Sequence, residues 1–315
     1  MSADAADHGA PLLDGEELRQ LERLDIVHLG AVLHGLGGQR ERSMGTRGLE
    51  FAGYRPYVPG DELRRVDWNI YARLREVFVK SAPDEGHVAL SLLIDGSGSM
   101  GQDGGAASKF RYAQRLAATL AAVALLSGDA AETHLLDDGE SWPGGRMATP
   151  ASVVPLLEDL SLLRRGGRTD LPASVRSYRR RRGDTEVAVL ISDGLAQPES
   201  VGEALEELAA AAQTATLVHV IDAAAQPPDL RGAVQLRDRE TGELLLVQAT
   251  PELRRRYAEG AAALAERVRA AARDAGVGYL RAPLDAVPLD LLARAAAEAE
   301  LVAFASGQSN VYVKV

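Results

Sequence analysis

The chain has 315 residues, of which 46% are hydrophobic, a formal net charge of −10 and no cysteine. A chain of this length and composition can fill one large hydrophobic core, or one large and one small core. The negative charge argues against nucleic acid as the main partner, because phosphate binding needs a cationic surface. The absence of cysteine excludes disulfides and thiolate metal sites, and it fits a reducing compartment.

The sequence offers no candidate for a membrane span. No stretch approaches the roughly 20 uninterrupted apolar residues that a spanning helix needs. The first residues, MSADAADHGAPLLDGEE, also lack the basic start and apolar middle of a signal peptide. We therefore expect a cytoplasmic protein without a membrane span.

Changes in composition and in the spacing of apolar residues divide the chain into four parts. Residues 1–13 are small and polar without a period, which predicts a flexible terminus. Residues 14–85 begin with Asp14 and Glu17 in a capping-box arrangement, followed by leucines at helical spacing and then by an aromatic-rich unit. Residues 86–300 alternate predicted strands and helices, and residues 301–315 form a C-terminal tail.

The alternation in residues 86–300 predicts the fold class. The stretch HVALSLLID, residues 87–95, is continuously apolar, as expected for a strand covered by helices on both faces. Further strands are predicted over 131–136, 185–194, 215–222 and 277–283, with helices between them and a hairpin over 233–248 that turns at Thr241-Gly242. This order predicts an α/β fold with a doubly wound, mostly parallel, Rossmann-like sheet, preceded by a small helical and β-containing unit.

Oxygen-bearing side chains follow the first predicted strand of this sheet at alternate positions: Asp95, Ser97 and Ser99. Ligands of doubly wound sheets bind at the carboxyl ends of the strands. Thr169, in the loop RRGGRTD, and Asp193, at the end of a later strand, are predicted at the same edge. Mg²⁺ takes about six oxygen ligands, so these residues predict a site for Mg²⁺ or Mn²⁺. With few direct carboxylates, the ion would attract a carboxylate from another molecule.

These five residues, in this order, resemble the metal-ion-dependent adhesion site, or MIDAS, of von Willebrand factor type A domains. The resemblance implies that residues 86–300 form such a domain. It also implies that Asp95, Ser97, Ser99 and Thr169 hold the ion, directly or through water, and that Asp193 orients the surrounding shell.

A second resemblance lies upstream, in GLEFAGYRPYVPGDELRRVDWNIYAR, residues 48–73. It is similar to the signature of a bacterial family known as domain of unknown function 58, as are the later stretches RDRETGELLLV and YLRAPLD. The matching positions are Glu50-Phe51, Arg55, Tyr57, Gly60-Asp61, Arg64, Asp67-Trp68 and Ala72-Arg73.

What is known of this family sets further expectations. Its members are typically encoded beside MoxR-type AAA+ ATPases. The resemblance therefore implies two protein partners, such an ATPase and a client protein, in metal-dependent assembly or maturation. Many members carry membrane helices before the signature, and because this chain shows none there, a soluble form is expected.

Other interpretations of the site stay open. Asp95, Ser97 and Ser99 also suit a helix-capping and turn cluster, which would leave a structural scaffold that binds no metal. Asp95 could instead be the nucleophile of a Mg²⁺-dependent phosphatase, although haloacid-dehalogenase-like enzymes carry a second Asp where this chain has Ser97. A serine-hydrolase elbow and a P-loop are absent from the sequence. His134 and His219 fall within predicted strands and are interpreted as core residues. We therefore expect a non-enzymatic protein-interaction module.

Overall fold

The computed structural model of the chain describes residues 11–23, 54–56, 78–80, 89–101, 108–126, 128–164, 170–182, 185–222, 232–237 and 244–295. The chain divides into a smaller unit, Arg40–His87, and a larger one that comprises Met1–Gln39 and Val88–Val315. In the smaller unit, strands β1 (Tyr54–Pro56) and β2 (Phe78–Lys80) pair antiparallel. This division differs from the predicted one, in which residues 14–85 form one part.

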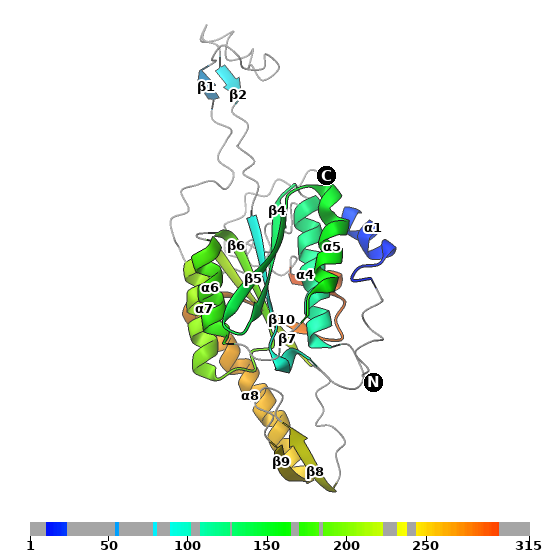
Figure 1. Cartoon of the computed structure of the whole chain (residues 1–315), viewed down its shortest axis with the longest axis vertical. Helices are drawn as coiled ribbons and strands as arrows, with labels where there is room; N and C mark the ends of the chain where they lie inside the picture. Colours follow the sequence, from blue (N-terminus) through cyan, green and yellow to red (C-terminus); the bar gives the residue numbers. More distant parts are fainter. Residues whose placement is uncertain are drawn as a thin grey trace. The chain divides into compact units, whose positions relative to one another are not determined.

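The larger unit is built on a six-stranded sheet in the order β10-β7-β6-β3-β4-β5 (Figure 1). Neighbouring strands are parallel, except for the antiparallel pair β4 and β5. The predicted α/β fold with a mostly parallel, Rossmann-like sheet is therefore confirmed. The strands are β3 (Ala89–Asp95), β4 (Ala130–Asp137), β5 (Glu140–Met147), β6 (Thr185–Ser192), β7 (Ala212–Ile221) and β10 (Gly278–Pro283).

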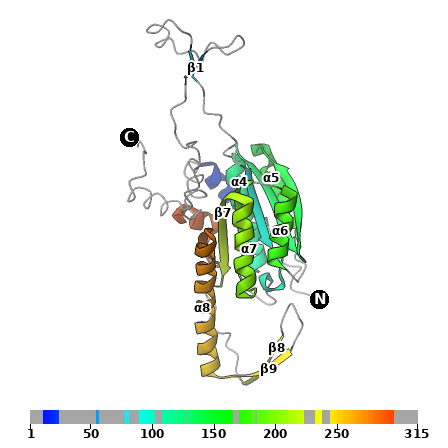
Figure 2. The ribbon, with the colours of Figure 1, turned by 90° about the vertical axis from the view of Figure 1, so that its left-hand side faces the viewer.

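Helices cover both faces of this sheet (Figures 1 and 2). One face carries α4 (Lys109–Leu126) and α5 (Val153–Leu162), and the other carries α6 (Leu171–Arg182), α7 (Pro198–Ala211) and α8 (Pro251–Ala275). Two short 3₁₀ helices are η3 (Gly98–Met100) and η4 (Pro150–Ser152), and residues 288–295 are also helical. None of the helices within the described residues has the length and apolar character that crossing a membrane requires.

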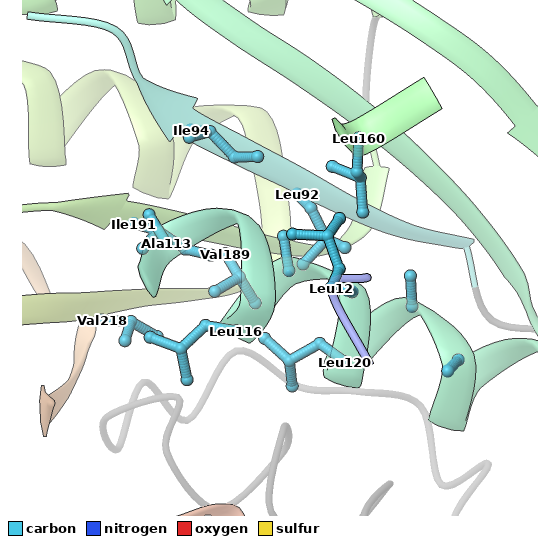
Figure 3. Close-up of a cluster of buried hydrophobic side chains, with 14 of the residues drawn as sticks. Leu12, Leu92, Ile94, Ala113, Leu116, Leu120, Leu160, Val189, Ile191 and Val218 are labelled. Carbon is cyan, nitrogen blue, oxygen red and sulfur yellow. The ribbon is translucent and has the colours of Figure 1, made fainter. Parts of the chain in front are cut away.

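Strand β3 runs through the middle of the sheet and contributes to the core on both faces. Leu92 and Ile94 pack with Leu116 of α4 and Leu160 of α5 (Figure 3), whereas Leu93 packs with the helices of the opposite face. This alternation follows from the two-residue period of a strand. The continuously apolar sequence of β3 is therefore the consequence of two cores that meet at one strand.

The antiparallel edge strand β5 was not predicted, because Pro143, Gly144 and Gly145 at its centre are typical of a loop. Proline is tolerated on an edge strand, where its missing N–H leaves no ladder bond unmade. At Gly144 any side chain would collide with Thr133 of β4. The turn between the strands, at Asp138 and Gly139, has positive φ at both residues, as tight hairpins require.

The N-terminal segment packs beside α4. Helix α1 (Gly15–Arg23) begins with the predicted capping box: Asp14 Oδ1 accepts from the Glu17 backbone N–H, and Glu17 Oε2 accepts from that of Asp14, both at 2.8 Å. The predicted flexible terminus, residues 1–13, needs correction at its end, because Leu12 and Leu13 are buried in the core. The predicted continuation of the helix beyond residue 23 lies outside the described residues.

The predicted hairpin is present as β8 (Gly232–Arg237) and β9 (Leu244–Ala249), and its predicted turn at Thr241-Gly242 lies outside the described residues. Helix α8 follows it, with Thr250 Oγ1 accepting from the Leu253 N–H as the N-cap. Every described side chain from residue 251 to 263 is exposed, and burial begins at Leu264. Only the second half of α8 therefore contributes to the core.

Candidate metal centre

Asp95 stands at the carboxyl end of β3, and both of its carboxylate oxygens have defined partners. Oδ1 accepts from the backbone N–H of Ser97 at 2.9 Å, and Oδ2 accepts from Ser192 Oγ, at the end of β6, at 2.6 Å. Asp95 and Ser97 are buried. The carboxylate is therefore held between the loop that follows β3 and the neighbouring strand.

The two predicted serines connect Asp95 to Asp193. Ser97 Oγ and Ser99 Oγ lie 3.0 Å apart at hydrogen-bond distance, and Ser99 Oγ donates to Asp193 Oδ1 at 3.0 Å. Asp193 Oδ1 also accepts from the Leu195 N–H at 3.1 Å. Four of the five predicted site residues are thus joined in one hydrogen-bonded cluster, although they come from two segments almost a hundred residues apart.

Thr169, the fifth predicted residue, lies outside the described residues. The next residue, Asp170, is described, and its side chain accepts from the Ala173 N–H at the start of α6. A methyl group built on Gly139, in the β4–β5 turn, would lie 3.9 Å from Asp170 Cβ. The chain next to Thr169 therefore lies beside the carboxyl end of β4, the strand adjacent to β3. Thr169 itself stays a prediction.

Gly96 explains how the loop after β3 is placed. Its N–H donates to the carbonyl oxygen of Leu136 in β4 at 2.8 Å, and a Cβ added to Gly96 would stand 2.8 Å from the same oxygen. A distance below 3.0 Å is not tolerated for a carbon atom against backbone, so the position requires glycine. The loop is thereby fixed to β4 on one side, while Ser99 bonds to Asp193, which follows β6, on the other.

Two residues of the cluster were not assigned from the sequence. Ser192 bonds Asp95, and Lys109, the first residue of α4, donates from Nζ to Asp193 Oδ2 at 2.7 Å. The side chains of Lys109 and Asp193 are 11% and 2% exposed, so the ion pair is buried. A lysine at the start of a predicted helix, in a chain with only two others, was the available signal.

The histidines that were interpreted as core residues are indeed buried. His219 Nε2 lies 3.0 Å from the carbonyl oxygen of Asp193, and its Nδ1 lies 2.8 Å from the Tyr279 hydroxyl. Burial lowers the pKa of His219, so the ring is neutral at neutral pH. His219 thus supports the backbone of Asp193. The ring of His134, in β4, packs edge-on against the ring of Tyr178, in α6.

The surroundings of Asp95 disfavour its ionised form. Burial raises its pKa from the ordinary 3.8 to about 6, and the negative charge of Asp193 adds to the effect, whereas the hydrogen bonds from Ser192 and Ser97 oppose it. A nearby cation would favour the ionised form of Asp95. Among the described residues of the cluster, the one ammonium group, on Lys109, is bonded to the other carboxylate.

The donor set fits a hard divalent cation. All candidate ligands are carboxylate or hydroxyl oxygens, which Mg²⁺ and Mn²⁺ prefer over nitrogen or sulfur. Over the described ranges, no three His, Asp or Glu side chains gather as a metal-binding group. The protein would hold such an ion through the Asp95 carboxylate and neutral hydroxyls, with Asp193 orienting the surrounding shell. A bound cation would relieve the unfavourable ionisation of Asp95.

The raised pKa of Asp95 has a measurable consequence for stability. We expect the free energy of unfolding of the metal-free protein to fall as pH rises, because folding favours the protonated acid. This contribution is complete below the ordinary pKa of 3.8 and is lost as pH rises through about 6. At about 1.4 kcal/mol per pH unit, it amounts to about 3 kcal/mol.

The pH effect can be measured by urea unfolding in a chelator at a series of pH values. Other groups titrate in the same range, so the informative quantity is the difference between the wild type and Asp95→Asn, which has no carboxyl group at this position. A difference that stays constant between about pH 4 and pH 7 would contradict the assignment of a raised pKa to Asp95.

The fold and the cluster define the class: an α/β protein with a mostly parallel sheet and an oxygen-rich site at the carboxyl ends of β3 and β6. The chain belongs to the family described as "Protein of unknown function DUF58", whose model matches residues 53–267. The family predicted from the sequence is thereby confirmed.

Relatives and solved structures complete the comparison. The chain is 28% identical over 251 residues to uncharacterized proteins of Mycobacterium tuberculosis and Mycobacterium bovis, with 78% of this chain and 77% of each relative covered. It is similar to the conserved hypothetical protein BatB from Bacteroides thetaiotaomicron, with 19% identity and a TM-score of 0.43, over 68% of this chain and 98% of that one. An aerotolerance-related membrane protein from Bacteroides fragilis gives 16% identity and a TM-score of 0.40, over 68% and 99%. Neither likeness bears on function.

Proposed function

We propose that the protein is a non-enzymatic interaction module that uses a bound Mg²⁺ or Mn²⁺ ion to recognise an acidic side chain on a protein partner. The observation that supports this is the hydrogen-bonded convergence of Asp95, Ser97, Ser99 and Asp193 at one edge of the sheet. Together with Thr169, these residues resemble the residue set of a MIDAS, and the proposal includes that residues 86–300 form a von Willebrand factor type A domain.

The residues have distinct roles in this proposal. Asp95, Ser97, Ser99 and Thr169 hold the ion, directly or through water, and Asp193 keeps the Ser99 hydroxyl in place by accepting a hydrogen bond from it. The bound ion supplies a positive charge, and it can bind a carboxylate oxygen of another molecule. Because hydroxyls are neutral ligands, they do not neutralise that charge, and the partner's carboxylate can do so.

The proposed partners rest on what is known of the family and not on the geometry of the site. Members of the family are typically encoded beside MoxR-type AAA+ ATPases. The proposal is therefore that such an ATPase and a client protein are the partners, and that they meet this protein in the cytoplasm during assembly or maturation of the client.

One observation favours a second candidate, a Mg²⁺-dependent phosphatase with Asp95 as nucleophile. Lys109 brings an ammonium group into the cluster, and phosphoryl transfer uses such a cation to stabilise charge on the transferred group. Ser97 still stands where haloacid-dehalogenase-like enzymes have their second Asp. Release of inorganic phosphate from p-nitrophenyl phosphate, dependent on Mg²⁺ and lost in Asp95→Asn, would favour this candidate over the interaction module.

The proposed function is tested by titrating Mg²⁺ into metal-stripped protein in a calorimeter. We expect the wild type to bind one ion and Ser99→Ala to bind it at least about tenfold more weakly, because a ligand and its bond to Asp193 are lost. Ser161→Ala is the matched control: this partly exposed serine donates to a backbone carbonyl on α5 and should leave binding unchanged.

A pull-down connects the ion to the partner. A MoxR-type ATPase or a client should be retained by the wild type in Mg²⁺, and released by a chelator or by Asp95→Ala. No heat of Mg²⁺ binding to the wild type, or equal binding by Ser99→Ala, would refute the metal site. Retention of the partner in the chelator would refute the adhesion mechanism and favour the metal-independent scaffold.

A further inference from the structure

Lys109 occupies an unusual position for a lysine. Its side chain is 11% exposed, and its ammonium group lies 2.7 Å from Asp193 Oδ2, within the cluster that contains the candidate metal ligands. Lysine is seldom buried, and a buried ammonium group is tolerated only when it is paired. Asp193 also bonds Ser99, so it connects the charge of Lys109 to a candidate metal ligand.

Formal charges show what this lysine does to the site. Without an ion, the cluster carries −1 from Asp95, −1 from Asp193 and +1 from Lys109, which gives −1 in total. A divalent cation changes the total from −1 to +1. Without the lysine, the corresponding totals are −2 and 0. Over these described residues, the charge of the cluster therefore reverses on ion binding only because Lys109 is present.

We propose that Lys109 sets the sign of the site, so that the cluster repels an acidic side chain when it holds no divalent ion and attracts one when it does. This inference rests on the proposed function and adds a specificity-determining residue to it. The ammonium group does not ligate the ion. It acts through Asp193, by cancelling a carboxylate charge that would otherwise neutralise the ion.

The proposal predicts opposite effects of one substitution on two ligands. Lys109→Met keeps a side chain of similar length and removes the charge. The ion would then enter a cluster of charge −2, so we expect Mg²⁺ to bind at least about tenfold more tightly than in the wild type. The loaded cluster would be neutral, and it would lose its attraction for carboxylates. Lys109→Arg keeps the charge and should behave like the wild type in both respects.

The experiment uses Mg²⁺ and acetate as probes, with the full chain. Calorimetric Mg²⁺ titrations are run in chloride and in acetate at equal ionic strength, so that general screening is matched. In the wild type and Lys109→Arg, acetate should tighten the apparent Mg²⁺ affinity, because a carboxylate that binds only the loaded site favours loading. In Lys109→Met, acetate should have no effect.

A folding control keeps the test decisive. Removing one partner of a buried ion pair destabilises a protein, so Lys109→Met could unfold without metal. The double variant Lys109→Met, Asp193→Asn removes both charges and returns the totals to −1 and +1. We expect its loaded form to regain the acetate effect. Circular dichroism and thermal unfolding in a chelator establish which variants are folded.

The outcomes separate this inference from the proposed function. Tighter Mg²⁺ binding by Lys109→Met, together with loss of the acetate effect, supports the role of Lys109. Wild-type binding of Mg²⁺ with equal or weaker binding by Lys109→Met overturns that role and leaves the metal site standing. An acetate effect that persists in Lys109→Met also overturns it. Failure of the wild type to bind Mg²⁺ overturns the proposed function itself, and the inference with it.

Discussion

Replacing Asp95 with Asn should abolish Mg²⁺ binding and, at the same time, make the metal-free protein more stable at neutral pH. The carboxylate is buried, and its pKa is raised to about 6, mainly by that burial. Its ionisation at neutral pH therefore costs stability, by up to about 3 kcal/mol. Asparagine avoids this cost. It can accept the bond from the Ser97 N–H with its carbonyl oxygen and present its amide group to Ser192 Oγ.

The two effects are measured on the same preparation. Urea unfolding in a chelator should give a larger free energy of unfolding for Asp95→Asn than for the wild type. Addition of Mg²⁺ should then stabilise the wild type but not the variant. Asp159→Asn, on the exposed face of α5, is the control and should change neither quantity. A variant that is less stable than the wild type without metal would contradict the raised pKa of Asp95. A variant that still gains stability from Mg²⁺ would contradict its role as a metal ligand.

Leu93→Ala should have the largest effect on the fold. Leu93 is fully buried in the central strand β3 and packs in the core formed with α6, α7 and α8. Truncation of such a leucine removes its transfer free energy and leaves a cavity, which costs about 2–5 kcal/mol. Because the sheet holds β3 between β4 and β6, the surrounding strands cannot collapse to fill that space.

The measurement is urea unfolding of Leu93→Ala beside Leu162→Ala. Leu162 is 67% exposed at the end of α5, so its truncation should change stability by no more than about 0.5 kcal/mol. Equal effects of the two substitutions would contradict the placement of β3 between two cores. Below its unfolding transition, Leu93→Ala should still bind Mg²⁺, since Leu93 is not part of the cluster.

Much of the fold could be predicted because the central strands carry strong local signals. β3, β6 and β7 are apolar along most of their length, and the helices between them have long runs of helix-forming residues. β5 has the opposite character, because glycines and a proline interrupt it, and it forms a strand through pairing with β4. The Asp138-Gly139 dipeptide is the local signal for that hairpin.

Most of the site residues that were predicted from the sequence lie at the end of a strand or in the loop that follows it. Asp95 and Asp193 stand at the ends of β3 and β6, and their positions follow from the parallel order of the two strands. The contact of Lys109 with Asp193 depends on where α4 begins over the sheet, which no local pattern specifies. The burial of Leu12 and Leu13, which lie in the predicted flexible terminus, also has no local signal. Two leucines without a period do not reveal the surface against which they pack.

The two halves of α8 should differ in how readily their backbone amides exchange hydrogen for deuterium. In the half that begins at Leu264, Val268 and Ala272 are buried, so opening the backbone there also exposes core side chains to water. In residues 251–263 every described side chain is already exposed, so local opening costs little more than the helical hydrogen bonds themselves. One continuous helix thus contains a boundary in local stability near residue 264, with the half that adjoins the β8–β9 hairpin on the side that opens first.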